Sequence, residues 1–272
     1  MDNVARTALM VAAYRAKESN RPNRLFYDPL SSVLAGQNAL KAAATRHRDD
    51  TYPYLTIRTR FFDDWLEKTL GSTYQQVVFL GAGMDTRAFR LKWPDAVQLW
   101  EIDCREVLAL KQARLSAVQA KARCGRIPVA ADLSTGEWPN DLLRHGFRTG
   151  VPSVWIAEGL FMYLPSSAVS QILCNVAALA PAGSQFGAEV FSEDFLHDDR
   201  NRTYLKEAAA RGTPWLFGCN EPEEFFARCG WRIDMITGPG GEGADFGRWP
   251  KPTDPRHPAG VSDRFFVIAA RA

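Results

Sequence analysis

Five short apolar runs, separated by segments of helical periodicity, constrain the fold of this chain more than any other feature. The runs are VVFLGAG (77–83), VQLWEID (97–103), RIPVAADL (126–133), SVWIAEG (153–159) and SQFGAEVF (184–191). The helix-like segments between them include VLALKQARLSAVQAKA after the second run and SSAVSQILCNVAALA (166–180) after the fourth. A strand–helix–strand order at this spacing predicts a parallel sheet with right-handed crossovers.

Different patterns flank this alternating region. VARTALMVAAYRAKE and TIRTRFFDDWLEKTL repeat apolar residues at helical spacing, whereas a charged and aromatic segment follows residue 191. A helix that ends at Gly230 comes before WRIDMIT (231–237) and RFFVIAA (264–270), which look like an antiparallel strand pair. The sequence therefore predicts a single α/β domain (1–272) with four parts: a helical cap (1–70), a cofactor-binding core (75–191), a lid (192–217), and a C-terminal helix and strand pair (218–272).

Composition and charge exclude several other classes of protein. The 33 Lys and Arg against 31 Asp and Glu give a net charge of +2, which argues against a dedicated nucleic-acid binder. No run approaches the ~20 apolar residues of a membrane span, and ALMVAAY near the N-terminus leads into charged residues without a cleavage site. The five cysteines form no C-x-x-C pair, so we expect reduced thiols and no metal site. We expect a cytoplasmic protein with no membrane or nucleic-acid partner; the oligomeric state stays open.

The end of the first apolar run carries the main chemical signal. Gly81 and Gly83 let the backbone turn tightly and approach a ligand where a Cβ atom would clash. The second run ends with Glu101 and Asp103, which lie 20 and 22 residues after Gly81. An acid at this spacing can accept hydrogen bonds from both hydroxyls of a ribose. The pattern therefore predicts a cofactor containing adenosine at the carboxyl ends of the parallel strands.

Two residues favour S-adenosyl-L-methionine over a dinucleotide. Thr86 stands where G-x-G-x-x-G would have its third glycine, and Asp85 would repel a pyrophosphate. S-adenosyl-L-methionine has no phosphate and carries a sulfonium and an ammonium, so a pocket rich in acids suits it. Asp132 at the end of the third strand run adds a carboxylate that can bind the adenine amino group while Leu133 packs on the ring, and Glu158 closes the fourth run. A nicotinamide-dependent oxidoreductase is the first alternative and a non-catalytic methyltransferase-like scaffold the second; a hydrolase is disfavoured because no G-x-S-x-G occurs.

These motifs resemble a known family. LGAGMDTRAFRL, WEID, VAADL and WIAEGLFMYL together are similar to the leucine carboxyl methyltransferase family and its bacterial relatives, which include O-methyltransferases of polyketide and other secondary-metabolite pathways. TALMVAAYRA, FYDPL and IRTRFFDDWL resemble its N-terminal helices, and PEEFFARCGW its late helix and strand, so the similarity covers nearly the whole chain. It implies a class I, Rossmann-like methyltransferase fold and transfer of a methyl group from the sulfonium to an oxygen.

The resemblance also implies roles for individual residues. Arg58 would pair with the methionine carboxylate of the cofactor, and Gly81 with Gly83 would form the cofactor loop. Asp103 would bind the ribose, and Asp132 with Leu133 would hold the adenine. Glu158 would lie near the amino-acid part of the cofactor. Tyr163 matches a family tyrosine at the reaction centre and is the catalytic candidate. The acceptor pocket is assigned to the aromatic residues of the lid, although core packing explains them equally well: Phe195, Tyr204, Trp215 and Phe217.

The acceptor itself is less constrained. A small metabolite is favoured over a protein C-terminal carboxylate, because motifs such as GAGMDTR are of bacterial type and the lid is aromatic and charged. A carboxylic acid, with a pKa near ~4, is ionised at pH 7 and needs no base, whereas a phenol near ~10 does. All four histidines fall outside the predicted strand ends, and only His47 and His197 lie where they could reach an acceptor. The sequence thus leans slightly towards a carboxylate.

The lid and the Gly- and Pro-rich loop 238–260 are expected to be mobile without ligand.

Overall fold

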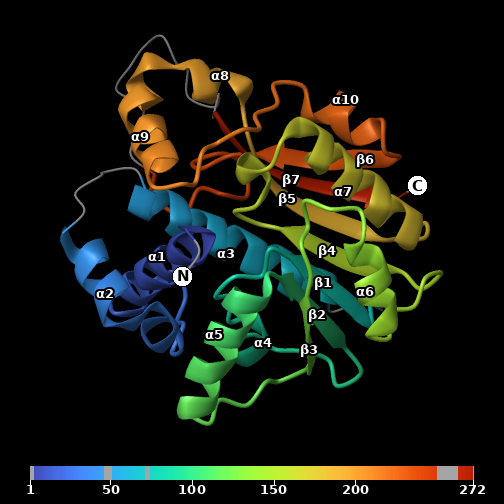
Figure 1. The fold of residues 1–272 in the computed structure, drawn as a ribbon, viewed down its shortest axis with the longest axis horizontal. Helices are drawn as coiled ribbons and strands as arrows, with labels where there is room; N and C mark the ends of the chain where they lie inside the picture. The colour runs from blue at the N-terminus through green and yellow to red at the C-terminus, as the bar shows by residue number, and fades with distance from the viewer. Residues whose placement is uncertain (1–2, 46–50, 71–73, 250–262, 272) are drawn as a thin grey trace.

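The computed structural model describes residues 3–45, 51–70, 74–249 and 263–271. Its centre is a seven-stranded sheet in the order β3-β2-β1-β4-β5-β7-β6 (Figure 1). The strands are β1 (Gln76–Leu80), β2 (Gln98–Asp103), β3 (Gly125–Ala130), β4 (Ser153–Ala157), β5 (Gln185–Phe191), β6 (Trp231–Thr237) and β7 (Arg264–Arg271). The first five are parallel, and β7 pairs antiparallel with both β5 and β6. The predicted parallel sheet and antiparallel strand pair are confirmed.

Helices cover both faces of the sheet. One apolar layer contains buried side chains of α1 (Asn3–Ser19), α2 (Ser31–Thr45), α3 (Thr51–Leu70) and α5 (Arg105–Ala117). The opposite layer contains those of α6 (Trp138–Arg144), α7 (Ser166–Leu179) and α10 (Pro222–Ala227). Because β1 and β4 are buried along their whole length, they form the continuous apolar runs seen in the sequence. The short helix α4 (Arg87–Arg90) and α6 were not anticipated.

The helix α3 lies directly against the sheet. Phe61 and Phe62 place their rings 5.0 Å and 5.7 Å from the ring of Phe266 in β7. Gly187 in β5 is required for this approach, because a Cβ atom there would lie 2.6 Å from the ring of Trp65. The helix is therefore part of the layer that supports the carboxyl ends of the strands.

The lid begins directly after β5. It contains α8 (Glu193–His197) and α9 (Asp199–Ala210), which Figure 1 shows in orange beside the blue helices α1 to α3, away from α6. Residues 238–249 of the Gly- and Pro-rich loop are described, and Arg248 of this part pairs with the buried Glu18 of α1 at 3.0 Å. Residues 250–260 lie outside the described residues, and the mobility of both segments stays a prediction.

Two expectations from the sequence are wrong in detail. Cys174 in α7 and Cys229 after α10 form a disulfide with their Cα atoms 4.7 Å apart, so not all five cysteines are reduced thiols. The pairing spans 55 residues and results from the packing of the two helices on one face, which cysteine spacing does not reveal. Strand β3 ends at Ala130, so Asp132 and Leu133 lie in the loop beyond it.

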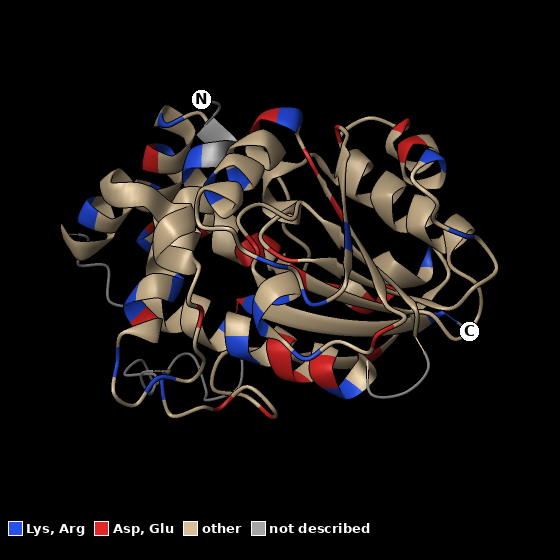
Figure 2. Ribbon diagram, turned by 90° about the horizontal axis from the view of Figure 1, so that it is seen from below, with Lys and Arg blue, Asp and Glu red and all other residues tan. Residues whose placement is uncertain are grey.

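Basic and acidic residues are interspersed along the described ribbon, as Figure 2 shows. None of the described helices is long and apolar enough to cross a membrane. Within the same described ranges, no group of three or more His, Cys, Asp and Glu side chains is arranged to hold a metal ion.

Candidate active site

A cavity of about 1270 Å³ opens at the carboxyl ends of β1, β2, β4 and β5. Its walls come from α1, α2, α3, the strand ends and the lid. Eleven of the twelve predicted site residues line it: Arg58, Gly81, Gly83, Asp103, Asp132, Leu133, Glu158, Tyr163, Phe195, Tyr204 and Trp215. Since typical single-ligand pockets enclose about 300–1,000 Å³, this volume suits a cofactor together with a second molecule.

The glycine loop after β1 needs its glycines for backbone conformation. Gly81 has φ +67° and Gly83 has φ +47°, values at which a Cβ atom is strained. A Cβ atom on Gly81 would also lie 3.1 Å from Leu160. The loop is fixed to β2, because the N–H of Ala82 donates to the carbonyl of Ile102 at 3.0 Å. The backbone therefore comes close to the cavity in a fixed conformation.

The structure distinguishes the two candidate ribose acids. Asp103 lines the cavity and accepts hydrogen bonds from the N–H groups of Gly83 and Cys104, both at 2.7 Å. Burial raises its pKa, against the opposing effect of these two donors. Glu101 is fully buried elsewhere, where Lys111 and Arg126 bind its carboxylate at 2.8 and 2.9 Å. Of these two acids, only Asp103 lines the cavity.

The loop after β3 supplies a polar and an apolar group at the same wall. Asp132 is exposed at the rim, and its Oδ1 accepts from the N–H and the hydroxyl of Ser134 at 2.8 and 2.6 Å. Leu133 next to it is buried and also lines the cavity. This pairing suits an adenine, which presents an amino group at its edge and an apolar face.

Arg58 joins the ends of two neighbouring strands. Its Nε donates to Glu158 at 2.8 Å, and its Nη1 donates to both carboxylate oxygens of Glu189 at 2.8 and 3.0 Å. Glu189 lies in β5, is fully buried and lines the cavity. Sequence reasoning missed it, although an acid inside the apolar run SQFGAEVF was a usable signal. Both carboxylates raise the pKa of Arg58 despite its burial, so it stays charged.

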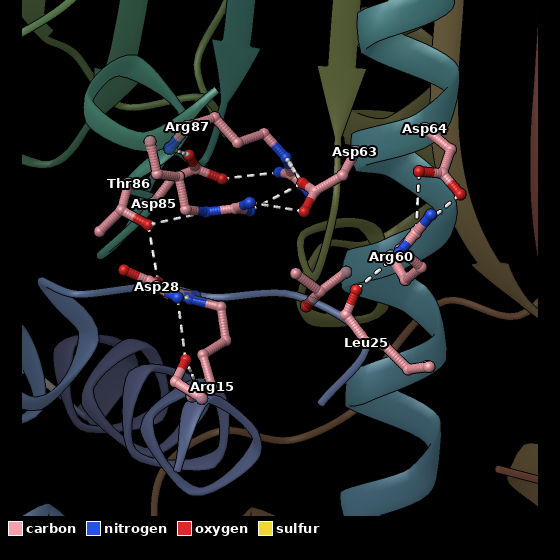
Figure 3. A network of polar contacts seen from close by, with 12 residues as sticks. Arg15, Leu25, Asp28, Arg60, Asp63, Asp64, Asp85, Thr86 and Arg87 are labelled. Carbon is pink, nitrogen blue, oxygen red and sulfur yellow. Dashed lines mark hydrogen bonds and ion pairs between the residues drawn. The ribbon is translucent and has the colours of Figure 1, made fainter. Parts of the chain in front are cut away.

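A second network ties the glycine loop to the N-terminal helices (Figure 3). Arg87 pairs with Asp63 of α3 at 2.7 Å, with Asp85 at 2.6 Å and with Glu158 at 2.8 Å. Thr86 donates to Asp28, which also binds Arg15 of α1. Burial disfavours the ionised form of Asp85, but the positive charges of Arg87, Lys111, Arg15 and Arg90 together outweigh this effect and lower the pKa of Asp85 to about 2. Because Arg87 compensates this charge, Asp85 by itself does not exclude a pyrophosphate.

Aromatic rings form the lid end of the cavity. Trp215 lies 4.5 Å from Phe191, 5.4 Å from Phe195, 5.3 Å from Tyr204 and 6.4 Å from Tyr163, measured between ring centroids. Burial raises the pKa of the Tyr163 phenol, so it stays protonated at neutral pH. The guanidinium of Arg264 lies 5.4 Å from the Phe195 ring and also lines the cavity.

The assignment of Phe217 to the acceptor pocket is wrong. Its ring packs 6.3 Å from Phe161 and 5.2 Å from Phe225 in the apolar layer on the other face of the sheet. The chain passes from the cavity to that layer between Trp215 and Phe217. Core packing therefore explains Phe217.

Comparisons with known proteins agree with this geometry. The family model described as leucine carboxyl methyltransferase matches residues 8–177, well over half of the chain. The chain belongs to the leucine carboxyl methyltransferase family. Two relatives, from Streptomyces avermitilis and Frankia alni, are provisionally named S-adenosyl-L-methionine-dependent methyltransferases, and each is 38% identical to this chain. Both alignments cover 85% of this chain; they cover 84% of the Streptomyces protein and 83% of the Frankia protein.

Solved structures show the same fold at low sequence identity. A DUF574 family protein from Streptomyces avermitilis has a TM-score of 0.63 at 17% identity and covers 96% of this chain and 97% of its own. Magnesium protoporphyrin IX methyltransferase from Synechocystis, crystallised with S-adenosylhomocysteine, has a TM-score of 0.51 at 12% identity and covers 95% and 96%. The sheet is thus that of a class I methyltransferase, and the nicotinamide-dependent oxidoreductase is set aside.

The cofactor of this methyltransferase is S-adenosyl-L-methionine, and the cavity fits it. Asp103 and Asp132 offer carboxylate acceptors on the side of β2 and β3, which suits the hydroxyl and amino groups of an adenosine. Arg58, Glu158 and Glu189 place charges of both signs at the ends of β4 and β5, which suits a zwitterionic amino-acid group. The thiol of Cys104 also lines the cavity, but burial raises its pKa to about 11, so it is not a nucleophilic thiolate at neutral pH.

None of the histidines that the structure describes lines the cavity of this methyltransferase. The side chain of His197 is 75% exposed on α8 and faces Glu193 at 3.9 Å. His145 follows α6, and its ring hydrogen-bonds to the carbonyl of Asp141. His47 and His257 lie outside the described residues. The expectation that His197 lies where it could reach an acceptor is therefore not supported by its position.

Proposed function

We propose that this methyltransferase transfers a methyl group to an oxygen of a small acceptor, with a carboxylate as the favoured nucleophile. The observation that carries the proposal is the chemistry of the lid end. Its described lining residues include no histidine, and the phenol of Tyr163 stays protonated. Glu189, a buried acid of the cavity wall, already accepts hydrogen bonds from Arg58 and Tyr54. An acceptor that is ionised before it binds needs no base from such a wall.

The two ends of the cavity then have separate tasks. When bound, S-adenosyl-L-methionine supplies a methyl group on a positively charged sulfur. Asp103 would hold the ribose hydroxyls, Asp132 and Leu133 the adenine, and Arg58 with Glu158 the amino-acid part. Trp215, with the rings around it, would hold the apolar body of the acceptor and exclude water from the reaction. Alignment of this kind supplies up to about 7–11 kcal/mol in favourable cases.

Positive charge at the lid end supports an anionic acceptor. The guanidinium of Arg264 lies 4.8 Å from the centroid of the Tyr54 ring, as part of the cavity wall. The Tyr54 hydroxyl in turn donates to Glu189, so the positive charge of Arg264 lies near the carboxylate that binds Arg58. A cationic wall raises the local concentration of carboxylates over neutral alcohols.

A protein C-terminal carboxylate is the second candidate. The name of the family carries it, since the matching model is described as a leucine carboxyl methyltransferase. The aromatic rings around Trp215 suit a small apolar body, whereas a peptide needs room for the rest of its chain. The carboxylate chemistry is common to both candidates.

The experiment is an acceptor screen with release of S-adenosylhomocysteine as the readout. Small aromatic and aliphatic carboxylic acids, matched phenols, and a peptide that ends in leucine are each supplied with S-adenosyl-L-methionine. We expect methyl esters of small acids, recognised by mass spectrometry and by cleavage in alkali. Ethers would overturn the carboxylate, and turnover of the peptide alone would establish the second candidate. Cofactor binding without turnover of any acceptor would favour the non-catalytic scaffold.

A pH–rate profile tests the absence of a histidine base. For a carboxylate acceptor, the rate should show no basic limb near 6–7, the range of a histidine. His197→Ala should keep most of the wild-type rate, and we expect the same of His47→Ala. A loss of two or more orders of magnitude in either variant, with cofactor binding intact, would indicate base-assisted methylation of a hydroxyl instead.

A further inference from the structure

Glu189 and Tyr54 form a polar set that no sequence motif singled out. Glu189 Oε1 accepts from the Tyr54 hydroxyl and from Arg58 Nη1, and its Oε2 accepts from Arg58 Nη1 and, at 2.5 Å, from the N–H of Gly159. Tyr54 and Arg58 are four residues apart on α3 and therefore share a face of the helix. We propose that Glu189 is a positioning residue, which holds Arg58 and the turn at Gly159 in the orientation that receives the amino-acid part of the cofactor.

The hydrogen bonds show why Glu189 acts through other residues. Both of its oxygens are occupied by donors from three residues, and its side chain is 0% exposed. A carboxylate in this state has little capacity left for a ligand. Its three partners line the cavity as well: Tyr54, Arg58 and Gly159.

The geometry of Arg58 shows what the positioning achieves. A guanidinium is planar and has five N–H groups in a fixed fork. Nε is bound to Glu158 and Nη1 to Glu189, so the plane of the fork is fixed on two sides. Within the described part of the chain, no hydrogen bond of Nη2 is found, and Arg58 lines the cavity. Nη2 is therefore the edge that remains to receive a carboxylate of a ligand.

Glu189 also fixes the turn that carries Glu158. Gly159 has φ +69°, and its N–H points to Glu189 Oε2. The ends of β4 and β5 are thus joined twice, by Arg58 and by this backbone bond. Paired residues Ala157 and Ala188 come just before the two acids, so Glu158 and Glu189 lie side by side at the sheet edge.

A glutamine cannot replace this carboxylate. Each oxygen of Glu189 faces at least one N–H donor, so an amide NH₂ group on either side would meet a donor of Arg58. Burial, and next the nearby charge of Glu189, raise the pKa of Tyr54 well above its usual value, so its hydroxyl stays a donor as well. Glu189→Gln therefore releases Arg58 while it preserves the size of the side chain.

The test compares two ligands by calorimetry. S-adenosylhomocysteine has the amino-acid part, whereas 5′-methylthioadenosine lacks it. In Glu189→Gln, the affinity for S-adenosylhomocysteine should fall at least tenfold, and the affinity for 5′-methylthioadenosine should change less than twofold. Tyr54→Phe, which removes one hydrogen bond from Glu189, should give the same selectivity with a loss of about threefold. If Glu189→Gln does not fold, the two ligand affinities of Tyr54→Phe alone test the proposal.

Glu101→Gln is the matched control. Glu101 is also a fully buried acid that binds two cations, but it does not line the cavity. We expect a lower melting temperature and an unchanged ratio of the two affinities. Arg58→Ala combined with Glu189→Gln should lose less selectivity than the sum of the two single losses, because Glu189 acts mainly through Arg58.

The outcomes separate this inference from the placement of the cofactor, on which it rests. If Arg58→Ala leaves the ratio of affinities unchanged, the proposed position of the amino-acid part is wrong. If Arg58→Ala lowers the ratio and Glu189→Gln and Tyr54→Phe do not, only the positioning role is wrong. Equal losses for both ligands in Glu189→Gln, or additive losses in the double variant, would also overturn it.

Discussion

The helical cap and the lid border the same cavity but are attached in different ways. The cap is bound to the strand ends by buried ion pairs, such as Arg58–Glu189 with side chains 6% and 0% exposed and Arg87–Asp63 with 3% and 6%. The ion pairs of the lid are open to solvent, such as Arg202–Asp199 with 64% and 80% exposed. The side of the lid that faces the cavity is instead a cluster of aromatic rings around Trp215.

This difference corresponds to the two ligands. A fixed cofactor suits a wall whose charges are held rigidly by one another, since every buried charge here requires its partner. An aromatic wall makes contacts that depend on shape more than on charge, so substitutions in the lid can change the acceptor without disturbing the cofactor end. Each prediction below would weaken or sharpen this comparison.

Arg87→Ala should have the largest effect on stability. Arg87 is 2% exposed and compensates Asp63, Asp85 and Glu158 together. Its loss leaves Asp85 without its ion-pair partner and weakens the pairing of Asp63 and Glu158, which keep Arg90 and Arg58. Breaking a buried pair typically lowers the free energy of unfolding by about 3–5 kcal/mol. Urea denaturation measures this loss. Arg228→Ala, which removes an exposed pair with Glu224, is the control, and a loss under 1 kcal/mol for Arg87→Ala would mean that the cap is held mainly by apolar packing.

Asp85→Asn should make the free energy of unfolding less sensitive to acid. Its pKa is lowered from 3.8 to about 2, so Asp85 stabilises the folded state above pH 3.8 and loses this contribution as the pH falls towards 2. A shift of this size corresponds to about 2 kcal/mol. Between pH 5 and pH 2, the free energy of unfolding of the wild type should therefore fall by about this much more than that of Asp85→Asn. In the lid, Asp199→Asn makes the same chemical change on a side chain that is 80% exposed and serves as the control variant.

How much of the fold and the site could be predicted from the sequence depends on how far apart the interacting residues lie along the chain. The strands and the glycine loop were predictable, because continuous burial and backbone conformation leave local signals, as in VVFLGAG. The ion pair between Arg58 and Glu189 joins residues 131 positions apart, so it leaves no local pattern. The disulfide of Cys174 and Cys229 was missed for the same reason.

The lid shows the limit within a single segment. Trp215 and Phe217 are both aromatic, only two residues apart, and belong to opposite apolar layers. Composition predicted an aromatic acceptor wall here, and three of the four assigned residues do line the cavity. The fourth residue, Phe217, lies in the opposite layer because the chain crosses to the other face of the sheet, and only the folded structure contains that information.

Asp103→Ala should weaken the cofactor end without affecting the lid. The variant removes the carboxylate that would bind the ribose hydroxyls and that holds the N–H of Gly83. Hydrogen bonds to a charged group contribute about 1.5–3 kcal/mol each, so the affinity for S-adenosylhomocysteine should fall at least tenfold by calorimetry. Trp215→Ala should leave the same affinity within twofold while it raises the KM of the acceptor. If Trp215→Ala weakens the cofactor as much as Asp103→Ala does, the two ends are not separate.

Arg202→Ala should have the smallest effect of all. Arg202 and Asp199 form an ion pair on α9 with both side chains mostly in water, where solvent screens their attraction. The free energy of unfolding should change by less than about 0.5 kcal/mol, as is usual for surface substitutions, and the change should disappear in 1 M salt. The rate of methyl transfer should also stay unchanged, because neither side chain lines the cavity. A loss above 1.5 kcal/mol that persists in salt would show that the charges of the lid are as important to its structure as the buried pairs are to the cap, since screened surface charges cannot account for an effect of that size.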